Sequence, residues 1–138
     1  MIIGIGTDVI EIERIENAIQ KTGNFFNKIY TEREQAYYRE NHKRVETLAG
    51  LFAAKEAVSK ALGTGFRSFS AKDIEILPNE LGKPEVHLYG GAKMLAKSLG
   101  ICKVHVSISH CKAYATSFVV AEGGGNNEVT IPTSNARD

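Results

Sequence analysis

Two carboxylates and a lysine, spread over the first half of the chain, are the residues best suited to chemistry. Asp8 lies near the end of an apolar, β-branched segment, and Glu56 and Lys60 stand four residues apart further on. Magnesium prefers oxygen ligands, commonly one or two carboxylates together with substrate phosphates and waters. Two carboxylates from separate elements therefore predict a metal-phosphate site. The simpler alternatives are an N-cap role for Asp8 and a surface Glu56–Lys60 ion pair one helical turn apart.

A second lysine occupies an unusual position on the same predicted helix. The spacing of apolar residues predicts a helix over Val45–Leu62, in which Lys55 and Ser59 fall inside the apolar arc. The residues of that arc are Leu48, Leu51, Phe52, Val58 and Leu62. A lysine in such a stripe either extends its amine to the surface or meets an anion. Together with Glu56 and Lys60 it would place a carboxylate and two amines at the edge of the core.

His110 and a glycine pair are weaker signals. His110 ends the segment Val104–His110, where strand alternation puts it on the core face. It is either a core histidine bonded to a carbonyl or a strand-end group that reaches a phosphate. Gly63-Thr64-Gly65 resembles a phosphate loop, but it follows a helix rather than preceding one, so its residues favour a helix cap and turn.

The elements that must position these residues alternate between helical and strand periodicity. Strands are expected at Ile2–Val9, around Ile74–Ile76, and at Glu85–Leu88, Val104–His110 and Tyr114–Ala121. Helices are expected around Ile12–Ile19, from the capping box at Thr31–Glu34 to Asn41, over Val45–Leu62, and at Ala92–Leu99. The order β-α-α-α-β-β-α-β-β predicts a single α+β domain with antiparallel hairpins packed on a central helix. The alanine-rich helix over Val45–Leu62 is expected to be that central helix. We expect this domain to cover residues 1–122 and residues 123–138 to form a disordered tail.

Composition narrows the class of protein. The chain has 138 residues, 43% of them hydrophobic and 24% charged, with a net charge of +1. A near-neutral charge argues against nucleic-acid binding, and no apolar run approaches the ~20 residues that span a bilayer. We expect a cytoplasmic protein without a secretion signal, in which the two cysteines, Cys102 and Cys111, are reduced.

Taken together, these motifs resemble the holo-acyl-carrier-protein synthases, the short bacterial class of phosphopantetheinyl transferases. The likeness runs in order from residue 1 to about 122. Its matching segments are Ile3–Asp8 with Arg14-Ile15, Phe52–Ala61 running into Gly63-Thr64-Gly65, Asp73–Ile76, Gly82-Lys83-Pro84 and Val106–His110. The segment Phe52–Ala61 is the most specific of them.

The resemblance implies transfer of the 4'-phosphopantetheine arm of coenzyme A to a serine of an apo-acyl carrier protein, with release of adenosine 3',5'-bisphosphate. In that reaction Asp8 and Glu56 would hold Mg²⁺, and Lys60 and His110 would neutralise phosphate oxygens. The resemblance also implies that Lys55 supports the anionic site. Gly63 and Gly65 would then lie at the coenzyme A site.

The resemblance also carries expectations about partners. It implies a homotrimer with sites between protomers, and docking of the acidic carrier protein on the first helix at Arg14 and Lys21. The chain departs from the family where members often have arginine, because Leu51 stands at that position. A carrier-protein binding module without activity and a different magnesium-dependent phosphotransferase are the alternative functions.

Overall fold

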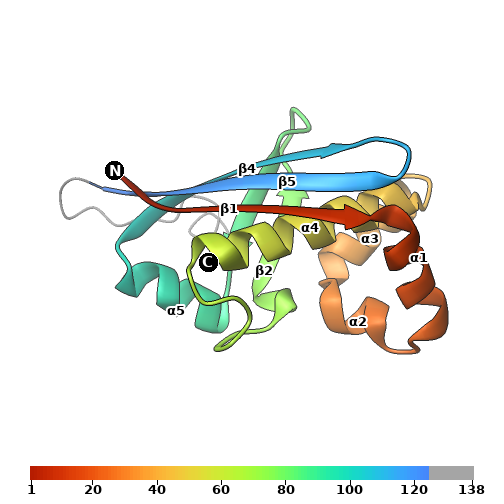
Figure 1. The fold of residues 1–138 in the computed structure, drawn as a ribbon, viewed down its shortest axis with the longest axis horizontal. Coiled ribbons are helices and arrows are strands. Elements are labelled where there is room, and N and C mark those ends of the chain that lie inside the picture. Colours follow the sequence, from red (N-terminus) through yellow and green to blue (C-terminus); the bar gives the residue numbers. More distant parts are fainter. Residues whose placement is uncertain (125–138) are drawn as a thin grey trace.

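A long helix, α4 (Val45–Ala61), lies between a three-stranded sheet and a two-stranded hairpin in the computed structural model, which describes residues 1–124 (Figure 1). Eleven of its 17 residues are buried. It packs against strands of both sheets, which confirms the prediction that this helix is central. The alanines among its buried residues allow these close neighbours, because their side chains are small.

The larger sheet joins the beginning and the end of the described chain. Its strands are β1 (Ile2–Glu11), β5 (Tyr114–Gly123) and β4 (Ile101–His110), antiparallel and in the order β1-β5-β4. In the register of this sheet, Asp8 lies opposite Ser117, which lies opposite Ile108. β1 continues to Glu11, so Asp8 is inside the strand rather than at its end. It does not cap the following helix, whose N-cap is Glu11.

The remaining elements cover the other side of α4. They are α1 (Ile12–Lys21), α2 (Phe25–Ile29), α3 (Glu32–Glu40), the short 3-10 helix η1 (Ala71–Asp73), the hairpin β2 (Ile74–Pro78) and β3 (Pro84–Leu88), and α5 (Gly90–Ser98). The capping box at the start of α3 is confirmed. The five-residue helix α2 was not predicted, because one turn is too short to show helical periodicity. β5 extends to Gly123, the first residue of the predicted tail, and the rest of that prediction falls on positions 125–138, outside the described residues.

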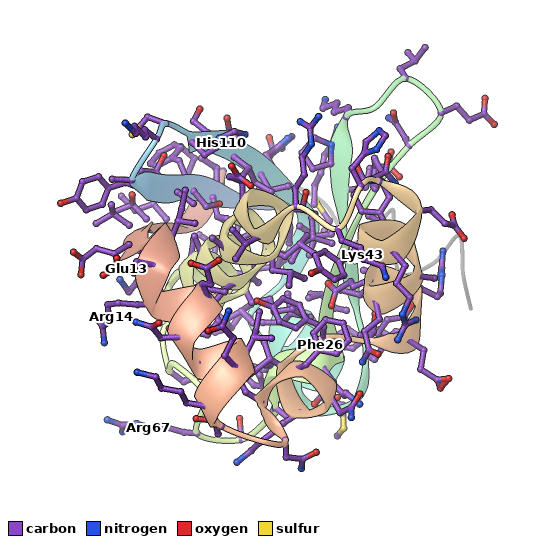
Figure 2. All side chains as sticks on the ribbon, turned by 90° about the vertical axis from the view of Figure 1, so that its right-hand side faces the viewer. Glu13, Arg14, Phe26, Lys43, Arg67 and His110 are labelled. Atoms are coloured by element: carbon purple, nitrogen blue, oxygen red, sulfur yellow. The ribbon has the colours of Figure 1, made fainter. Side chains whose placement is uncertain are left out.

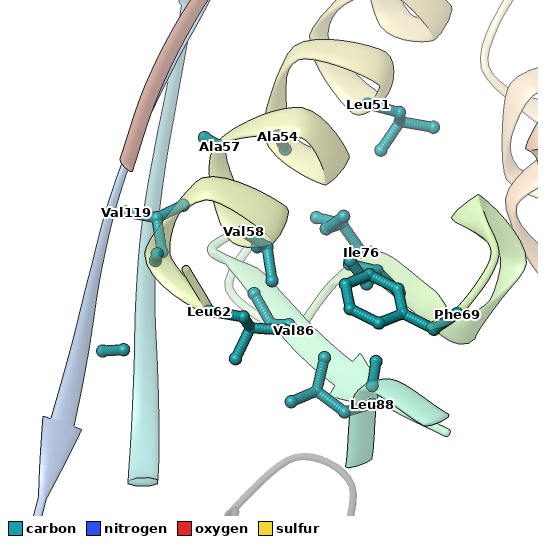
Figure 3. Close-up of a cluster of buried hydrophobic side chains, with 14 of the residues drawn as sticks. Leu51, Ala54, Ala57, Val58, Leu62, Phe69, Ile76, Val86, Leu88 and Val119 are labelled. Atoms are coloured by element: carbon teal, nitrogen blue, oxygen red, sulfur yellow. The ribbon is translucent and has the colours of Figure 1, made fainter. Parts of the chain in front are cut away.

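The hydrophobic core fills the space between α4 and the β2–β3 hairpin (Figure 3). Val58, Ile76 and Val86 are completely or almost completely buried there. Burial of a side chain of this size stabilises a fold by about 1.5–3 kcal/mol. This contact packs the β2–β3 hairpin against the face of α4 that points away from the large sheet.

Two glycines allow β1 to approach α4 unusually closely. A Cβ atom at Gly6 would lie 1.9 Å from the Ala57 carbonyl oxygen, and one at Gly4 would lie 2.0 Å from that of Ala61. No real Cβ contact is that short, so only glycine permits this crossing. The crossing brings the strand that carries Asp8 against the helix that carries Glu56 and Lys60.

The outer face of the large sheet has no helix on it within residues 1–124 (Figure 1). Large apolar side chains are exposed on this face, with Ile5 and Val9 each 60% exposed and Phe118 51% exposed. Tyr114, further along β5, is 45% exposed. We call these four residues the outer sheet patch. Within the described range, none of the helices has the length and apolar character needed to cross a membrane.

Candidate active site

Asp8 and Lys60 meet where β1 crosses α4. The Lys60 ammonium lies 3.2 Å from Asp8 Oδ1 and donates a hydrogen bond to the Thr7 carbonyl oxygen at 2.9 Å. The Lys60 side chain is still 52% exposed, so its ammonium is open to a ligand. The alternative of a Glu56–Lys60 surface pair is wrong, because the ion pair that Lys60 forms within residues 1–124 is with Asp8.

Glu56 is half-buried on the same stretch of α4 and faces the same charges. Partial burial raises the pKa of its carboxyl above the usual range, the nearby Asp8 carboxylate raises it further, and Lys60 opposes both effects. A carboxylate destabilised by burial and by a like charge gains from a bound cation. The strand and the helix thus bring together three of the predicted residues, Asp8, Glu56 and Lys60.

The donor set of this site fits magnesium with a phosphate ligand. Its two carboxylates are hard oxygen donors from separate elements, and no group of three or more acidic, histidine or cysteine side chains that could hold a metal forms within residues 1–124. Magnesium commonly keeps waters and substrate phosphates in its coordination sphere, so a pair of carboxylates is sufficient protein ligation. Lys60 supplies positive charge beside them.

Lys55 points away from this site. Its ammonium donates to Glu34 and to the Ala71 carbonyl oxygen, both at 2.9 Å, and also to the Ile74 carbonyl oxygen. An ammonium has three N–H donors, and all three are used. The periodicity correctly placed Lys55 in the apolar arc. The expected phosphate contact has no support in its geometry, because the anion that it meets is the Glu34 carboxylate.

A pocket with aromatic walls adjoins Glu56. Its volume is about 470 Å³, and its walls come from α2, α4 and the loop before η1. Phe25, Phe52 and Phe66 line it together with Glu56. Nothing in the sequence pattern predicted this pocket, although four of the chain's six phenylalanines line it. An apolar ligand group bound here would lie next to the carboxylate pair.

His110 lies in a different pocket. It is exposed at the end of β4 and lines a cavity of about 420 Å³ together with Arg44, Tyr37 and Leu51. Figure 2 shows it at the edge of the large sheet. Leu51, at the position where the family often has arginine, is buried in the wall of this pocket. Arg44, an exposed basic residue that lies in none of the sequence motifs, lines the same pocket.

Gly63 and Gly65 form the C-terminal cap and turn of α4. Both have a positive φ, 88° at Gly63 and 63° at Gly65, which favours glycine. The amide of Gly63 donates to the Lys60 carbonyl oxygen, and the amide of Gly65 donates to that of Ser59. These two amides are therefore already bonded, and the cap interpretation accounts for both glycines.

Arg14 and Lys21 are exposed on α1. Figure 2 shows Arg14 pointing outward from this helix. Neither side chain forms an ion pair with another residue of the described chain, so the alternative of Arg14 paired with Glu11 or Glu13 is wrong. Both cations are free to meet an acidic partner.

The fold around this site, a buried α4 between two antiparallel sheets, is shared by a solved holo-[acyl-carrier-protein] synthase at a TM-score of 0.83. The family model of the 4'-phosphopantetheinyl transferase superfamily matches residues 4–119. The chain belongs to this family, which confirms the resemblance seen in its motifs.

Similar proteins and solved structures include several holo-[acyl-carrier-protein] synthases. The chain is 56% identical over 127 residues to a holo-[acyl-carrier-protein] synthase of Clostridium perfringens strain 13, covering 89% of this chain and 96% of the relative. Among solved structures, the holo-[acyl-carrier-protein] synthase of Neisseria meningitidis is 40% identical, with a TM-score of 0.83 over 88% of this chain and 99% of that one. The synthase of Bacillus anthracis, solved in complex with coenzyme A, is 39% identical, with a TM-score of 0.75 over 90% and 99%.

Proposed function

We propose that this protein is a holo-[acyl-carrier-protein] synthase, which transfers the 4'-phosphopantetheine group of coenzyme A to a serine of an apo-acyl carrier protein. The serine oxygen forms a bond to the phosphorus that bears the pantetheine arm. The bond from that phosphorus to the bridging oxygen breaks, and adenosine 3',5'-bisphosphate leaves. The observation that carries the proposal is the convergence of Asp8, Glu56 and Lys60 in a chain of this family.

The acidic and basic residues of the site would have different roles. Asp8 and Glu56 would hold magnesium, which when bound supplies positive charge to the diphosphate oxygens. Lys60 would neutralise a phosphate oxygen, since its exposed ammonium lies 3.2 Å from Asp8 Oδ1 and its charge also acts on Glu56. Phosphoryl transfer depends mainly on placing the nucleophile and neutralising charge, so these residues supply what the reaction needs. A carboxylate of the site or a bound water would accept the serine proton.

His110 would act from a second copy of the chain. It lies in a pocket lined by neither Asp8, Glu56 nor Lys60, yet it has the chemistry of a phosphate-binding group. The outer sheet patch supports a homotrimer, because exposed apolar residues clustered on one sheet face mark an interaction surface. Assembly through this face would cover the patch and build each site from two protomers.

Mass spectrometry of an apo-acyl carrier protein tests this function. Incubation with the protein, coenzyme A and magnesium should add the mass of one phosphopantetheine to the serine, and chelation of the metal should prevent it. A carrier protein that binds but keeps its mass would favour a binding module without activity. If the carrier protein is neither bound nor modified, both the transferase function and the binding-module function are overturned.

A further inference from the structure

A buried ion pair joins α3 to α4 at the position next to Glu56. Lys55 and Glu34 lie 2.9 Å apart, and their side chains are 1% and 0% exposed. The Glu34 carboxylate also accepts hydrogen bonds from the Thr31 amide at 2.9 Å and the Ile76 amide at 2.8 Å. A single carboxylate thus ties the start of α3 to β2 and to Lys55.

The lysine end of this pair holds the segment that leads into β2. Lys55 donates to the carbonyl oxygens of Ala71 in η1 and Ile74 in β2. Ala71 and the preceding Ser70 line the aromatic pocket beside Glu56. The same ammonium therefore bonds to the segment that forms one part of the pocket lining and belongs to α4, which forms another part.

Stability alone does not account for a charged pair at this place. Burial raises the pKa of Glu34 and lowers the pKa of Lys55, although each charge favours the ionised form of the other. Replacing a buried ion pair with apolar residues of similar volume is often neutral or stabilising. The pair differs from an apolar contact in that its bonds have direction and fix how the helix is turned about its axis.

The turn of α4 decides where Glu56 points. Adjacent residues on a helix project about 100° apart. With Lys55 bonded to α3 and β2, Glu56 is directed toward the aromatic pocket and the charge of Asp8. A small rotation or shift of α4 would move the carboxylate relative to Asp8.

We propose that Lys55 is a positioning residue, which with Glu34 and the carbonyl oxygens of Ala71 and Ile74 holds Glu56 and the adjoining pocket wall in place for metal binding. This role rests on the proposed function of the site, in which Glu56 is a metal ligand. It differs from the role that the resemblance implies for Lys55, which is to support the anionic site. Removal of a group that positions a metal ligand typically lowers metal affinity or activity by about 10–100-fold.

The test compares metal affinity in Lys55→Met and in a variant of equal thermal stability. The probe is Mn²⁺ in the presence of coenzyme A, with free Mn²⁺ measured by electron paramagnetic resonance at a temperature where each variant is folded. Lys55→Met keeps the length of the side chain and removes its charge and donors. We expect Mn²⁺ affinity to fall about 10–100-fold.

The matched control is Ile101→Ala. Ile101 is buried at the start of β4, opposite Gly123 and far along the sheet from the row that contains Asp8. Removing its side chain should lower the melting temperature and leave Mn²⁺ affinity within about twofold, because additivity holds for distant sites. An equal loss of affinity in this control would overturn the proposal, since the effect would then follow from stability.

A double-variant cycle with Glu56→Gln separates the possibilities. If Lys55 acts through Glu56, Lys55→Met should cost little further affinity once Glu56→Gln is present. If Glu56→Gln weakens Mn²⁺ binding and Lys55→Met does not, the positioning role fails while the proposed metal site stands. If Glu56→Gln has no effect, both fail.

If Lys55→Met does not fold, Glu34→Gln tests the same positioning role with a smaller change. It preserves the shape of the side chain and removes the charge that faces Lys55. Mn²⁺ affinity should fall in the same direction, by a smaller factor. Unchanged affinity in a folded Glu34→Gln variant would contradict the proposal.

Discussion

The Lys60 ammonium is bonded to β1, 3.2 Å from Asp8 Oδ1, rather than to Glu56 on its own helix. A cation of the protein thus lies at the carboxylates proposed to hold magnesium. When a metal and a phosphate bind, the same ammonium is close enough to pair with the phosphate.

Lys60→Met tests this arrangement, because it removes the charge and keeps the length of the side chain. We expect turnover at saturating substrates to fall by about 10²–10³, the usual cost of losing one such electrostatic contact. Metal affinity measured without coenzyme A should not fall, since a neighbouring positive charge has been removed. If Lys60→Met turns over as fast as the unsubstituted protein, Lys60 has only a structural role.

Asp8→Asn and Glu56→Gln should each abolish most turnover, because each removes a charged ligand from a hard cation. Both side chains are partly exposed, and each substitution keeps the shape of the side chain, so the fold should remain intact by circular dichroism. Glu40→Gln, an exposed change on α3, is the control and should keep full activity. Near-normal activity of either site variant at limiting magnesium would show that the carboxylates are not metal ligands.

The raised pKa of Glu56 predicts how its substitution changes stability with pH. A carboxyl whose folded-state pKa exceeds its unfolded-state pKa holds its proton more tightly when folded, so its contribution to stability is lost as pH rises through the folded-state pKa. Without metal at pH 7, Glu56→Gln should therefore raise the melting temperature. The difference should shrink below the usual glutamate pKa of 4.5.

Thermal melts with a chelator across this pH range provide the measurement. Addition of magnesium and coenzyme A should then stabilise the unsubstituted protein more than Glu56→Gln. A variant that is less stable than the unsubstituted protein at every pH would contradict the burial argument.

Arg14→Glu should raise the Michaelis constant for carrier protein and flatten its salt dependence. Exposed charges mainly accelerate association with an oppositely charged partner, and salt screens them over about 8–10 Å. The constant for coenzyme A should change little. Lys97→Glu, an exposed change of equal charge on α5, should leave both constants unaltered.

Steady-state kinetics at several salt concentrations would distinguish the outcomes. If both Michaelis constants rise in Arg14→Glu, this residue belongs to the catalytic centre. If neither changes, the carrier protein docks elsewhere. Lys21→Glu should repeat the Arg14→Glu result if α1 as a whole receives the partner.

Phe118→Asp should dissociate the proposed trimer, because it places a charge in the centre of the outer sheet patch. Light scattering should report a smaller particle, and activity should fall if His110 acts across protomers. Met94→Asp on α5, where the side chain is 73% exposed, is the control and should change neither. An unchanged particle mass in Phe118→Asp would place the interface on another surface.

The sequence predicted the elements well wherever a local signal was strong. The capping box Thr31–Glu34 set the start of α3, and apolar periodicity set α4 to within one residue of Val45–Ala61. Glu34 shows the limit of such signals. Its place in the capping box accounts for the bond to Thr31, but its bonds to Lys55 and Ile76 depend on how α3 packs on α4 and β2.

The candidate site divides in the same way. The residue types and motif predicted Asp8, Glu56 and Lys60, and the crossing of β1 with α4 brings their charges together. Strand alternation predicted which sheet face His110 occupies. It could not predict the distance between His110 and Asp8, because this distance depends on how three strands pair. The aromatic pocket was missed because its walls come from segments with no common periodicity.

If Asp8 and Glu56 hold the proposed metal, the close crossing of Gly6 and Ala57 would also influence which size of ion the site favours. Asp8 follows Gly6 by two residues on β1, and Glu56 precedes Ala57 on α4, so the separation of the two backbones sets the span between the carboxylates. Magnesium binds its oxygens at about 2.0–2.1 Å in a strict octahedron, whereas calcium accepts about 2.3–2.6 Å and variable geometry. A side chain at position 6 would widen the span toward the larger ion. Selectivity for the smaller ion would therefore depend on a glycine that never touches it.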